Sequence, residues 1–140
     1  MPTIFTRIIE GELPGRFVWR DERCVAFLSI APIRPGHALV VPIAEVDQWL
    51  DIEADLAAHL MRVSHAIGRA QRDAFSPVRV GLIIAGLEVP HTHLHLVPID
   101  RESDLSFANA DPSASAASMD DAAERLRAAL RAAGHPEVAE

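Results

Sequence analysis

Residues 89–98 read VPHTHLHLVP, and three of the chain's seven histidines stand at alternate positions in this stretch. The histidines are His91, His93 and His95, and the residues between and after them are Thr92, Leu94 and Leu96. In a β-strand, alternate side chains point to the same face of the sheet. The pattern therefore predicts a strand over 91–99 with three imidazoles on one face and the other three side chains on the opposite face.

The histidine row has three possible explanations: a metal site, scattered surface imidazoles, or a catalytic row. Along a strand, residues two apart are separated by roughly 6.5 to 7 Å, whereas a zinc–imidazole bond is about 2 Å long. One metal ion therefore cannot readily take all three histidines, although an H-x-H pair can share an ion with a third ligand from elsewhere. Strict alternation is unusual for surface histidines, so the pattern favours catalysis.

Transfer at phosphorus is a reaction that such a row can serve. A neutral imidazole is nucleophilic near pH 7, because its pKa is near 6.5 and its second nitrogen can be held as a donor. The middle residue, His93, is then the nucleophile. Its neighbours His91 and His95 can donate hydrogen bonds to phosphate oxygens or to the leaving atom. The preceding residues 86–89 offer close backbone approach and N–H donors for an anion.

The rest of the chain predicts alternating helices and strands. The expected helices are 3–10, ended by Gly11, then 52–75, with Asp51 as N-cap, and 120–133. The other expected strands are 16–20, 24–30, 37–42 and 78–85, and the Ala/Ser-rich residues 106–119 indicate a loop. This order predicts an α+β fold with a mainly antiparallel, five-stranded sheet. We expect one domain over 1–140, with its core at about 3–99 and a linker at 100–119.

Composition narrows the function classes. Lys and Arg total 13 against 20 Asp and Glu, a net charge of −7, which argues against general nucleic-acid binding. Cys24 is the only cysteine, so an internal disulfide and a thiolate metal cluster are excluded. The beginning of the sequence does not resemble a signal peptide, and no apolar run approaches the ~18 residues of a membrane helix. We therefore expect a cytoplasmic protein with no membrane partner.

The sequence VPHTHLHLVP resembles the H-φ-H-φ-H-φ-φ signature of the histidine triad (HIT) superfamily, where φ is a hydrophobic residue. Thr92 departs from it at one hydrophobic position. Residues 4–42, IFTRIIEGELPGRFVWRDERCVAFLSIAPIRPGHALVVP, resemble the N-terminal half of that family, including its PGH element. The likeness covers roughly residues 3–99. It implies a HIT-like fold and a nucleotidyl hydrolase or transferase, phosphoramidase-like, acting on nucleoside 5′-phosphate derivatives.

The resemblance also implies roles for individual residues. His93 attacks the α-phosphate and forms a covalent nucleotidyl-histidine, His95 contacts the phosphate, His91 supports the network, and His37 of PGH is the fourth active-site histidine. The expected nucleoside-binding residues are Ile4, Phe5, Ile8, Phe27, Leu28, Ser29 and Ile30. Beside the phosphate we expect Gly86, Leu87, Glu88 and Val89. A homodimer, a small nucleotide substrate and no cofactor are also expected.

Several positions depart from the family pattern. Ser29 stands where many members have an acidic residue that binds the ribose hydroxyls, and Leu87 replaces the usual Gln. Glu88 replaces a small polar residue, and a carboxylate repels a phosphate. Glu88 therefore points outward, selects against highly charged substrates, or marks a different substrate.

The zinc of some members depends on a C-x-x-C and a histidine, whose positions here correspond to Thr3, Thr6 and Glu45. No zinc is expected. The remaining histidines, His59, His65 and His135, are expected to face solvent.

These features leave three hypotheses. The first is a hydrolase that cleaves a nucleoside 5′-monophosphate from an amine, acyl or phosphate leaving group through a His93 adduct. The second is a nucleotide-binding module with little catalysis, suggested by Ser29, Leu87 and Glu88. The third is a metal-dependent enzyme that uses the H-x-H pair.

Overall fold

The computed structural model describes residues 2–140, in which five β-strands, three α-helices and three 3-10 helices (η) are found. In chain order they are α1 (Ile4–Ile9), β1 (Phe17–Arg20), β2 (Cys24–Leu28), β3 (Ala38–Pro42), η1 (Trp49–Asp51), α2 (Ala54–Phe75), β4 (Arg79–Ile83), β5 (Leu94–Ile99), η2 (Glu102–Asp104), η3 (Phe107–Asn109) and α3 (Ala116–Ala132). The expected single domain over 1–140 stays a prediction, and Met1 lies outside the described residues.

The five strands form one antiparallel sheet in the spatial order β1-β2-β3-β5-β4. β3 and β5 are neighbours in the middle of this sheet, and Leu39 lies opposite His95. The expected α+β fold with a mainly antiparallel, five-stranded sheet is confirmed. Within residues 2–140, none of the helices combines the length and the apolar character needed to cross a membrane.

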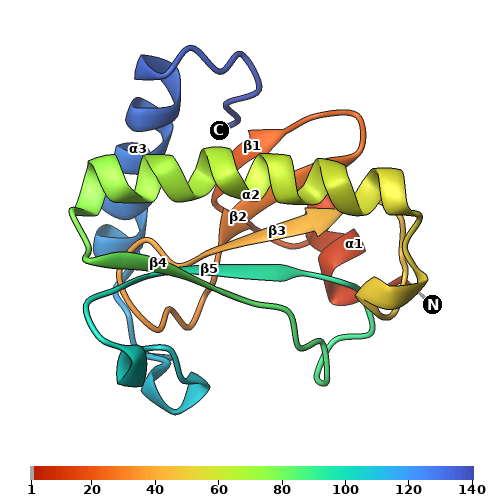
Figure 1. Cartoon of the computed structure of the whole chain (residues 1–140), viewed down its shortest axis with the longest axis horizontal. Helices are drawn as coiled ribbons and strands as arrows, with labels where there is room; N and C mark the ends of the chain where they lie inside the picture. Colours follow the sequence, from red (N-terminus) through yellow and green to blue (C-terminus); the bar gives the residue numbers. More distant parts are fainter. Residues whose placement is uncertain (1) are drawn as a thin grey trace.

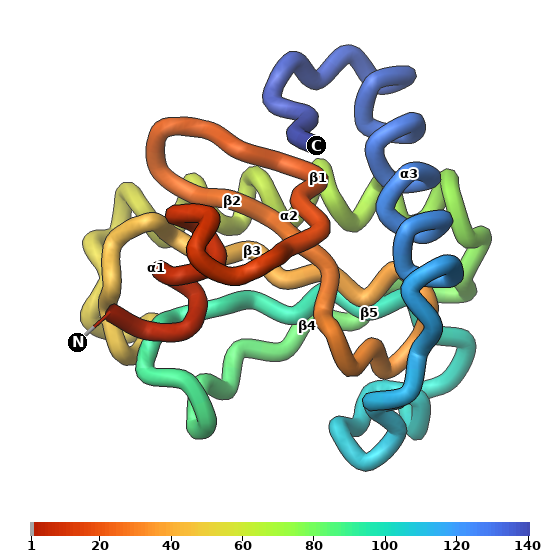
Figure 2. Tube along the Cα trace, turned by 180° about the vertical axis from the view of Figure 1, so that it is seen from behind, coloured from red at the N-terminus to blue at the C-terminus, as the bar shows by residue number. Residues whose placement is uncertain are grey.

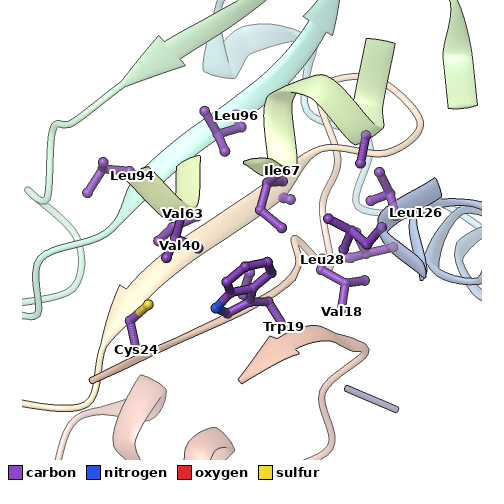
Figure 3. Packing of buried hydrophobic residues seen from close by; sticks show 14 of the residues in the cluster. Val18, Trp19, Cys24, Leu28, Val40, Val63, Ile67, Leu94, Leu96 and Leu126 are labelled. Carbon is purple, nitrogen blue, oxygen red and sulfur yellow. The ribbon is translucent and has the colours of Figure 1, made fainter. Parts of the chain in front are cut away.

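The two faces of the sheet carry different helices. α2 and α3 cover one face (Figure 1), and α1 lies on the other (Figure 2). The larger core fills the space between the sheet and α2 and α3, where Val40, Leu94 and Leu96 pack with Val63 and Ile67 of α2 (Figure 3). Because strand side chains alternate, the odd-numbered residues of β5 point to the opposite face. His95 therefore lies on the face that carries α1.

The C-terminal residues cover the β1 edge of the sheet. Trp19 forms an isolated antiparallel bridge with Val138. The Arg20 N–H donates to the Glu137 carbonyl at 2.9 Å, and the Ala139 N–H donates to the Val18 carbonyl at 3.2 Å. These bonds satisfy backbone groups that an open edge strand leaves unpaired.

β5 begins at Leu94, so the prediction of a strand from His91 is wrong for residues 91–93. The His91 N–H bonds to the Val89 carbonyl, and both the Thr92 N–H and its hydroxyl donate to the Val46 carbonyl. Loop carbonyls thus take the hydrogen bonds that a strand ladder would need. The other strands keep their predicted places but are shorter at their ends.

The prediction of Asp51 as the N-cap of the long helix is wrong. Asp51 belongs to η1, because the Ile52 N–H bonds back to the Trp49 carbonyl and closes a 3-10 turn. The N-cap position is Glu53, whose side chain makes no capping hydrogen bond. The long helix therefore starts two residues later than predicted.

The C-terminal helix starts at Ala116, four residues before its predicted start. Ser115 is its N-cap, since the Ser115 side chain accepts from the Ser118 N–H. The expected linker is also partly helical at η2 and η3. The Ala/Ser-rich composition suits a helix with a serine cap as well as a loop, and here the helix forms.

Two of the three histidines expected to face solvent do not. His59 on α2 lies 2.8 Å from the Asp21 carboxylate, and its side chain is only 20% exposed. The His135 ring packs against Trp19 with ring centroids 5.2 Å apart. His65 is exposed, as predicted.

Candidate active site

Four buried histidines gather on the α1 face of the sheet. His37 precedes β3, His91 and His93 precede β5, and His95 lies in β5; none is more than 9% exposed. The ring centroids of His93 and His95 are 4.8 Å apart, and those of His37 and His95 are 5.2 Å apart. The structure thus brings together the four histidines singled out in the sequence.

A backbone amide determines where the proton of His37 lies. The Ile33 N–H donates to His37 Nδ1 at 3.0 Å, so in the neutral ring Nδ1 carries no hydrogen. Nε2 therefore carries it and donates to His95 Nδ1 at 2.9 Å. Because His95 Nδ1 accepts this bond, the hydrogen of a neutral His95 is on Nε2. His95 Nε2 is thus a hydrogen-bond donor for the site.

Burial keeps these rings uncharged. Burial lowers the pKa of His37 to about 4 and is the main cause that lowers the pKa of His95 to about 3. The neighbouring His37 and His93 lower the pKa of His95 further. Both rings are therefore neutral at pH 7, the protonation state that the bonds from Ile33 through His37 require.

His93 is held with one nitrogen free. His93 Nδ1 lies 2.7 Å from the His91 carbonyl oxygen, which can only accept, so Nδ1 carries the hydrogen. Burial lowers the pKa of His93, while the carbonyl bond and the negative charge of Glu88 act in the opposite direction. A neutral ring with its Nε2 lone pair free has the properties of a nucleophile.

The loop that carries His37 is anchored from the helix side of the sheet. Gln71 of α2 donates from Nε2 to the Gly36 carbonyl at 2.9 Å and to the Leu96 carbonyl at 2.8 Å. Gly36 has φ +89°, and a Cβ there would lie 2.4 Å from the Phe75 ring, so this position needs glycine. Gln71 thereby ties together the residues next to His37 and His95.

Three of the expected nucleoside-binding residues lie together beside the histidines. Phe5, Ile8 and Phe27 belong to one apolar cluster on the α1 face. The Phe5 ring is 4.7 Å from His93 and 5.7 Å from Phe27, in edge-to-face arrangements. Phe5 and Phe27 are buried beside the candidate nucleophile, and Ile8 is the partly accessible member of the three.

Other expected nucleoside-binding residues are placed differently. The Leu28 side chain points to the opposite face and joins the helix-side core, so it is not brought to the histidines. Ile4 and Ile30 are exposed. Ser29 and His37 both line a cavity of about 260 Å³ between the 32–37 loop and the start of α3.

The segment expected to meet the phosphate is largely open to solvent. Gly86 has φ +78°, Glu88 is exposed, and the Leu87 side chain is 95% exposed. Val89 packs against the apolar cluster of Phe5 and Phe27. The charge of Glu88 nevertheless acts on His93.

Phe107 was missed in the sequence and lies against the histidines. Its ring, on η3, is 4.9 Å from the His95 ring in an edge-to-face arrangement, and Phe107 is 47% exposed. Small residues dominate its stretch, SFANADPSASAASM, and this composition predicts a linker. The signal available was one aromatic residue within that composition.

Comparison with known families identifies the chain. Residues 10–102 match the family model described as "HIT domain". The chain belongs to the HIT family. This family comprises nucleotide-binding hydrolases and transferases. The HIT signature suggested by the sequence is therefore confirmed at the family level.

Known HIT proteins are similar to this one in sequence and in fold. "Protein hit" of Bacillus subtilis is 34% identical over 100 residues, 68% of this chain and 69% of the relative. A zinc-bound histidine triad family protein from Mycobacterium smegmatis has a TM-score of 0.80 at 27% identity, covering 93% of this chain and 94% of that one. A hypothetical histidine triad nucleotide-binding protein from Sulfolobus tokodaii has a TM-score of 0.81 at 26% identity, covering 91% of both chains.

The donors at the positions that the family resemblance gives to zinc do not fit zinc in this HIT protein. Thr3, Thr6 and Glu45 do come together there, beside His91. Zinc sites are built from Cys, His, Asp and Glu, whereas two of these side chains are hydroxyls. Both nitrogens of His91 are also engaged in hydrogen bonds, so the H-x-H pair does not present two free ligand atoms.

A second cluster of side chains that could bind a metal ion is held together by hydrogen bonds. Asp21, Cys24 and His59 each place one ligand atom within 4.8 Å of the others. Burial raises the pKa of Asp21, but the bonds from Trp19, the Arg23 and Cys24 amides and His59 outweigh it and lower that pKa to about 2. Burial also raises the pKa of the Cys24 thiol. The group is a hydrogen-bonded carboxylate beside a protonated thiol.

Proposed function

We propose that this HIT protein is a nucleotidyl hydrolase or transferase that works through a covalent nucleotidyl-His93 intermediate. Its substrate is a nucleoside 5′-monophosphate joined to an amine, acyl or phosphate leaving group. The observation that carries the proposal is the arrangement of the His93 and His95 rings. His93 presents a free Nε2 lone pair, and the adjacent His95 presents Nε2–H.

The chemistry follows from these two nitrogens. The His93 Nε2 lone pair attacks the α-phosphorus and forms a P–N bond, while the bond from phosphorus to the leaving group breaks. The leaving group departs with the bonding electrons and takes up a proton. The Nε2–H of His95 donates to a phosphate oxygen, stabilising the charge that develops there. Water, or another acceptor, then attacks phosphorus, loses a proton and returns the bonding pair to His93.

The apolar cluster on the α1 face supports a nucleoside as the transferred group. Phe5 and Phe27 are buried next to His93, and the partly buried Ile8, Phe17 and Val89 form the accessible edge of the cluster. A nucleobase that packs on this surface places its 5′-phosphorus near the histidines. We assign the nucleoside to this cluster and the phosphate to His93 and His95.

An adenosine 5′-phosphoramidate tests the proposal. We expect turnover by the wild type and an adenylated protein seen by intact mass, with both lost in His93→Ala. His65→Ala is a matched control, because His65 is an exposed histidine on α2. Equal turnover in the wild type and His93→Ala would contradict the mechanism.

The alternative function, a nucleotide-binding module with little catalysis, is favoured by residues 87 and 88. Leu87 has no polar group for a leaving atom and is 95% exposed, and Glu88 places negative charge near a phosphate site. Calorimetry with adenosine 5′-monophosphate separates the two functions. Tight binding without a covalent adduct from any nucleotide conjugate would favour the binding module.

We also propose that the protein is a homodimer joined through β4. β4 is an edge strand of the sheet. Beside it, Met61 and Val78 are 57% and 61% exposed, and they line a cavity of about 500 Å³ between α2 and β4. Light scattering should give twice the chain mass, and Val78→Asp together with Met61→Asp should give the monomer mass. A cytoplasmic location is part of this proposal and accords with a free, buried Cys24.

A further inference from the structure

The N-terminus of α1 is bonded to the histidine row through side chains. Thr3 Oγ1 lies 2.7 Å from His91 Nδ1, a contact between residues 88 positions apart. Glu45 accepts from the Thr3 N–H at 2.7 Å and from the Thr6 hydroxyl at 2.5 Å. These side chains meet at the positions that the family resemblance gives to zinc ligands.

The side-chain polar hydrogens of Thr3, Thr6 and His91 each have an acceptor. His91 Nε2 lies 2.7 Å from the Pro42 carbonyl, which only accepts, so Nε2 carries the hydrogen. In the neutral ring His91 Nδ1 must then accept, and its donor is the Thr3 hydroxyl. The Thr3 oxygen in turn accepts the Thr6 N–H at 3.1 Å. The orientation and the tautomer of His91 are therefore set by Pro42 on one side and Thr3 on the other.

Glu45 holds the two threonines in the orientation that this arrangement needs. The hydrogen bonds from Thr6 and from the Thr3 amide lower the pKa of Glu45, so its carboxylate is ionised at pH 7 and only accepts. The Thr6 hydroxyl hydrogen is thereby committed to Glu45. The Thr3 hydroxyl hydrogen then goes to His91 Nδ1 at 2.7 Å, which is much closer than the Thr6 hydroxyl oxygen at 3.4 Å.

The group is linked to the candidate nucleophile by one peptide oxygen. The His91 carbonyl accepts the Nδ1–H of His93 at 2.7 Å, and this bond leaves His93 Nε2 free. The position of that carbonyl depends on how the buried His91 ring is held. Thr3 is also the N-cap of α1, which carries Phe5. The ring centroid of Phe5 lies 5.8 Å from that of His91 and 4.7 Å from that of His93. A change at Thr3 thus reaches His93 through His91 and through α1.

We propose that Thr3, Thr6 and Glu45 form a metal-free clamp that positions His91 and, through its carbonyl, the nucleophile His93. Hydroxyls and a carboxylate here hold α1 to the histidine row by hydrogen bonds, with no metal ion. Thr3 and Glu45 are positioning residues, and their effect on catalysis rests on the proposed function. Their effect on the His91 tautomer does not.

Nitrogen NMR of the histidine rings tests the clamp independently of activity. We expect the wild type at pH 7 to show His91 as the Nε2–H tautomer and His93 as the Nδ1–H tautomer. Thr3→Val keeps the side-chain shape but removes the hydroxyl, and should leave His91 Nδ1 without its donor and change its shift. Thr3→Ser should restore the wild-type shift. A wild-type His91 with hydrogen on Nδ1 would overturn the proposal, whether or not the protein turns over nucleotides.

Kinetics and metal analysis complete the test. Hydrogen-bond partners that orient metal-bound imidazoles typically change activity by about 10- to 100-fold, and we expect a similar effect where the imidazole is oriented without a metal. We expect Thr3→Val and Glu45→Gln to lower kcat at least ~10-fold with little change in KM, and Thr3→Ser to recover most of it. Glu53→Gln is the matched control, since Glu53 is exposed and makes no capping bond. Unchanged kcat in Thr3→Val, in an active wild type, would overturn the positioning role.

Added zinc distinguishes a clamp from a metal site. We expect no stoichiometric zinc in the wild type incubated with zinc and then desalted. The variant Thr3→Cys, Thr6→Cys, Glu45→His should retain one zinc per chain, because it supplies thiolate and imidazole ligands at the same place. Stoichiometric zinc in the wild type that is lost in Thr3→Val would overturn the metal-free clamp.

Discussion

His37 donates from Nε2 to Nδ1 of His95 across 2.9 Å, and this bond leaves the hydrogen of a neutral His95 on Nε2. The hydrogen on His37 is in turn placed by the Ile33 amide. A backbone N–H therefore determines, through two imidazoles, that His95 carries its hydrogen on Nε2.

Replacing His37 should weaken catalysis through His95. In His37→Ala, His95 Nδ1 loses its donor, so the ring can carry its hydrogen on either nitrogen. Loss of one oriented hydrogen-bond donor to developing charge typically costs about 10²- to 10³-fold in rate. We expect adduct formation on His93 to slow by at least ~100-fold in single-turnover mixing with an adenosine 5′-phosphoramidate. A rate equal to that of His65→Ala would contradict this role.

The buried histidines should make the fold less stable as the pH falls. In the folded state the pKa values of His37 and His95 are lowered to about 4 and about 3, from an ordinary value of 6.5. Between those values the unfolded chain binds more protons, so the free energy of unfolding decreases as pH decreases. The stabilisation is complete above about pH 6.5 and is lost as the pH falls toward 3. The thermal midpoint should therefore drop between pH 7 and pH 5.

The same scan in His95→Asn gives the control. Removing one depressed imidazole should flatten the dependence on pH in this range. Asp21, with its pKa lowered to about 2, contributes in the same direction but below pH 4, so it does not obscure the comparison. A midpoint that rises from pH 7 to pH 5 in the wild type would show that the sign is wrong.

Phe107 should contribute to substrate binding. Its ring lies edge-to-face against His95 and is partly exposed, so one side of it is open to a bound group. Aromatic pairs of this kind contribute about 0.5–1.5 kcal/mol. Phe107→Ala should lower kcat/KM about 2- to 10-fold, most strongly for aromatic leaving groups. Phe107→Tyr should retain activity, and an unchanged preference between aromatic and aliphatic leaving groups in Phe107→Ala would argue against contact.

Glu88 should disfavour substrates with additional negative charge. Its carboxylate acts on His93, and among the described residues His93 and His95 have no Lys or Arg contribution to their pKa shifts. In Glu88→Gln, KM for a nucleoside polyphosphate conjugate should fall more than KM for a phosphoramidate. Because salt screens exposed charges, the difference should shrink at 1 M salt. Glu22→Gln, an exposed change on the β1–β2 turn, is the control.

The sequence pattern predicts where most strands and helices lie along the chain, because the periodicity of apolar residues reflects which side chains are buried. Leu94 and Leu96 do face the helices, and His93 and His95 share the other face. The convergence of His37 on His95 came from the family resemblance, because no local pattern reports a contact between residues 58 apart.

Other features depend on tertiary partners that a local pattern does not contain. His59 is half-buried because Asp21, on the β1–β2 turn, lies beside it. The small neighbours of Phe107 predict a linker, yet its ring packs on His95. Aspartate is a common N-cap residue, but Asp51 is part of the 3-10 helix η1 and does not cap α2. In each case the position of the residue depends on a contact or a turn that its residue type alone does not predict.

Gln71 gives the helix side of the sheet an influence on reactivity. Its amide nitrogen donates to two carbonyls. One belongs to Gly36, just before β3, and the other to Leu96 in the adjacent strand β5. The separation of the His37 and His95 rings therefore depends on Gln71, which is buried on the helix side of the sheet. A substitution at Gln71 should therefore disturb His37 and His95 together, although Gln71 lies on the other side of the sheet from both rings.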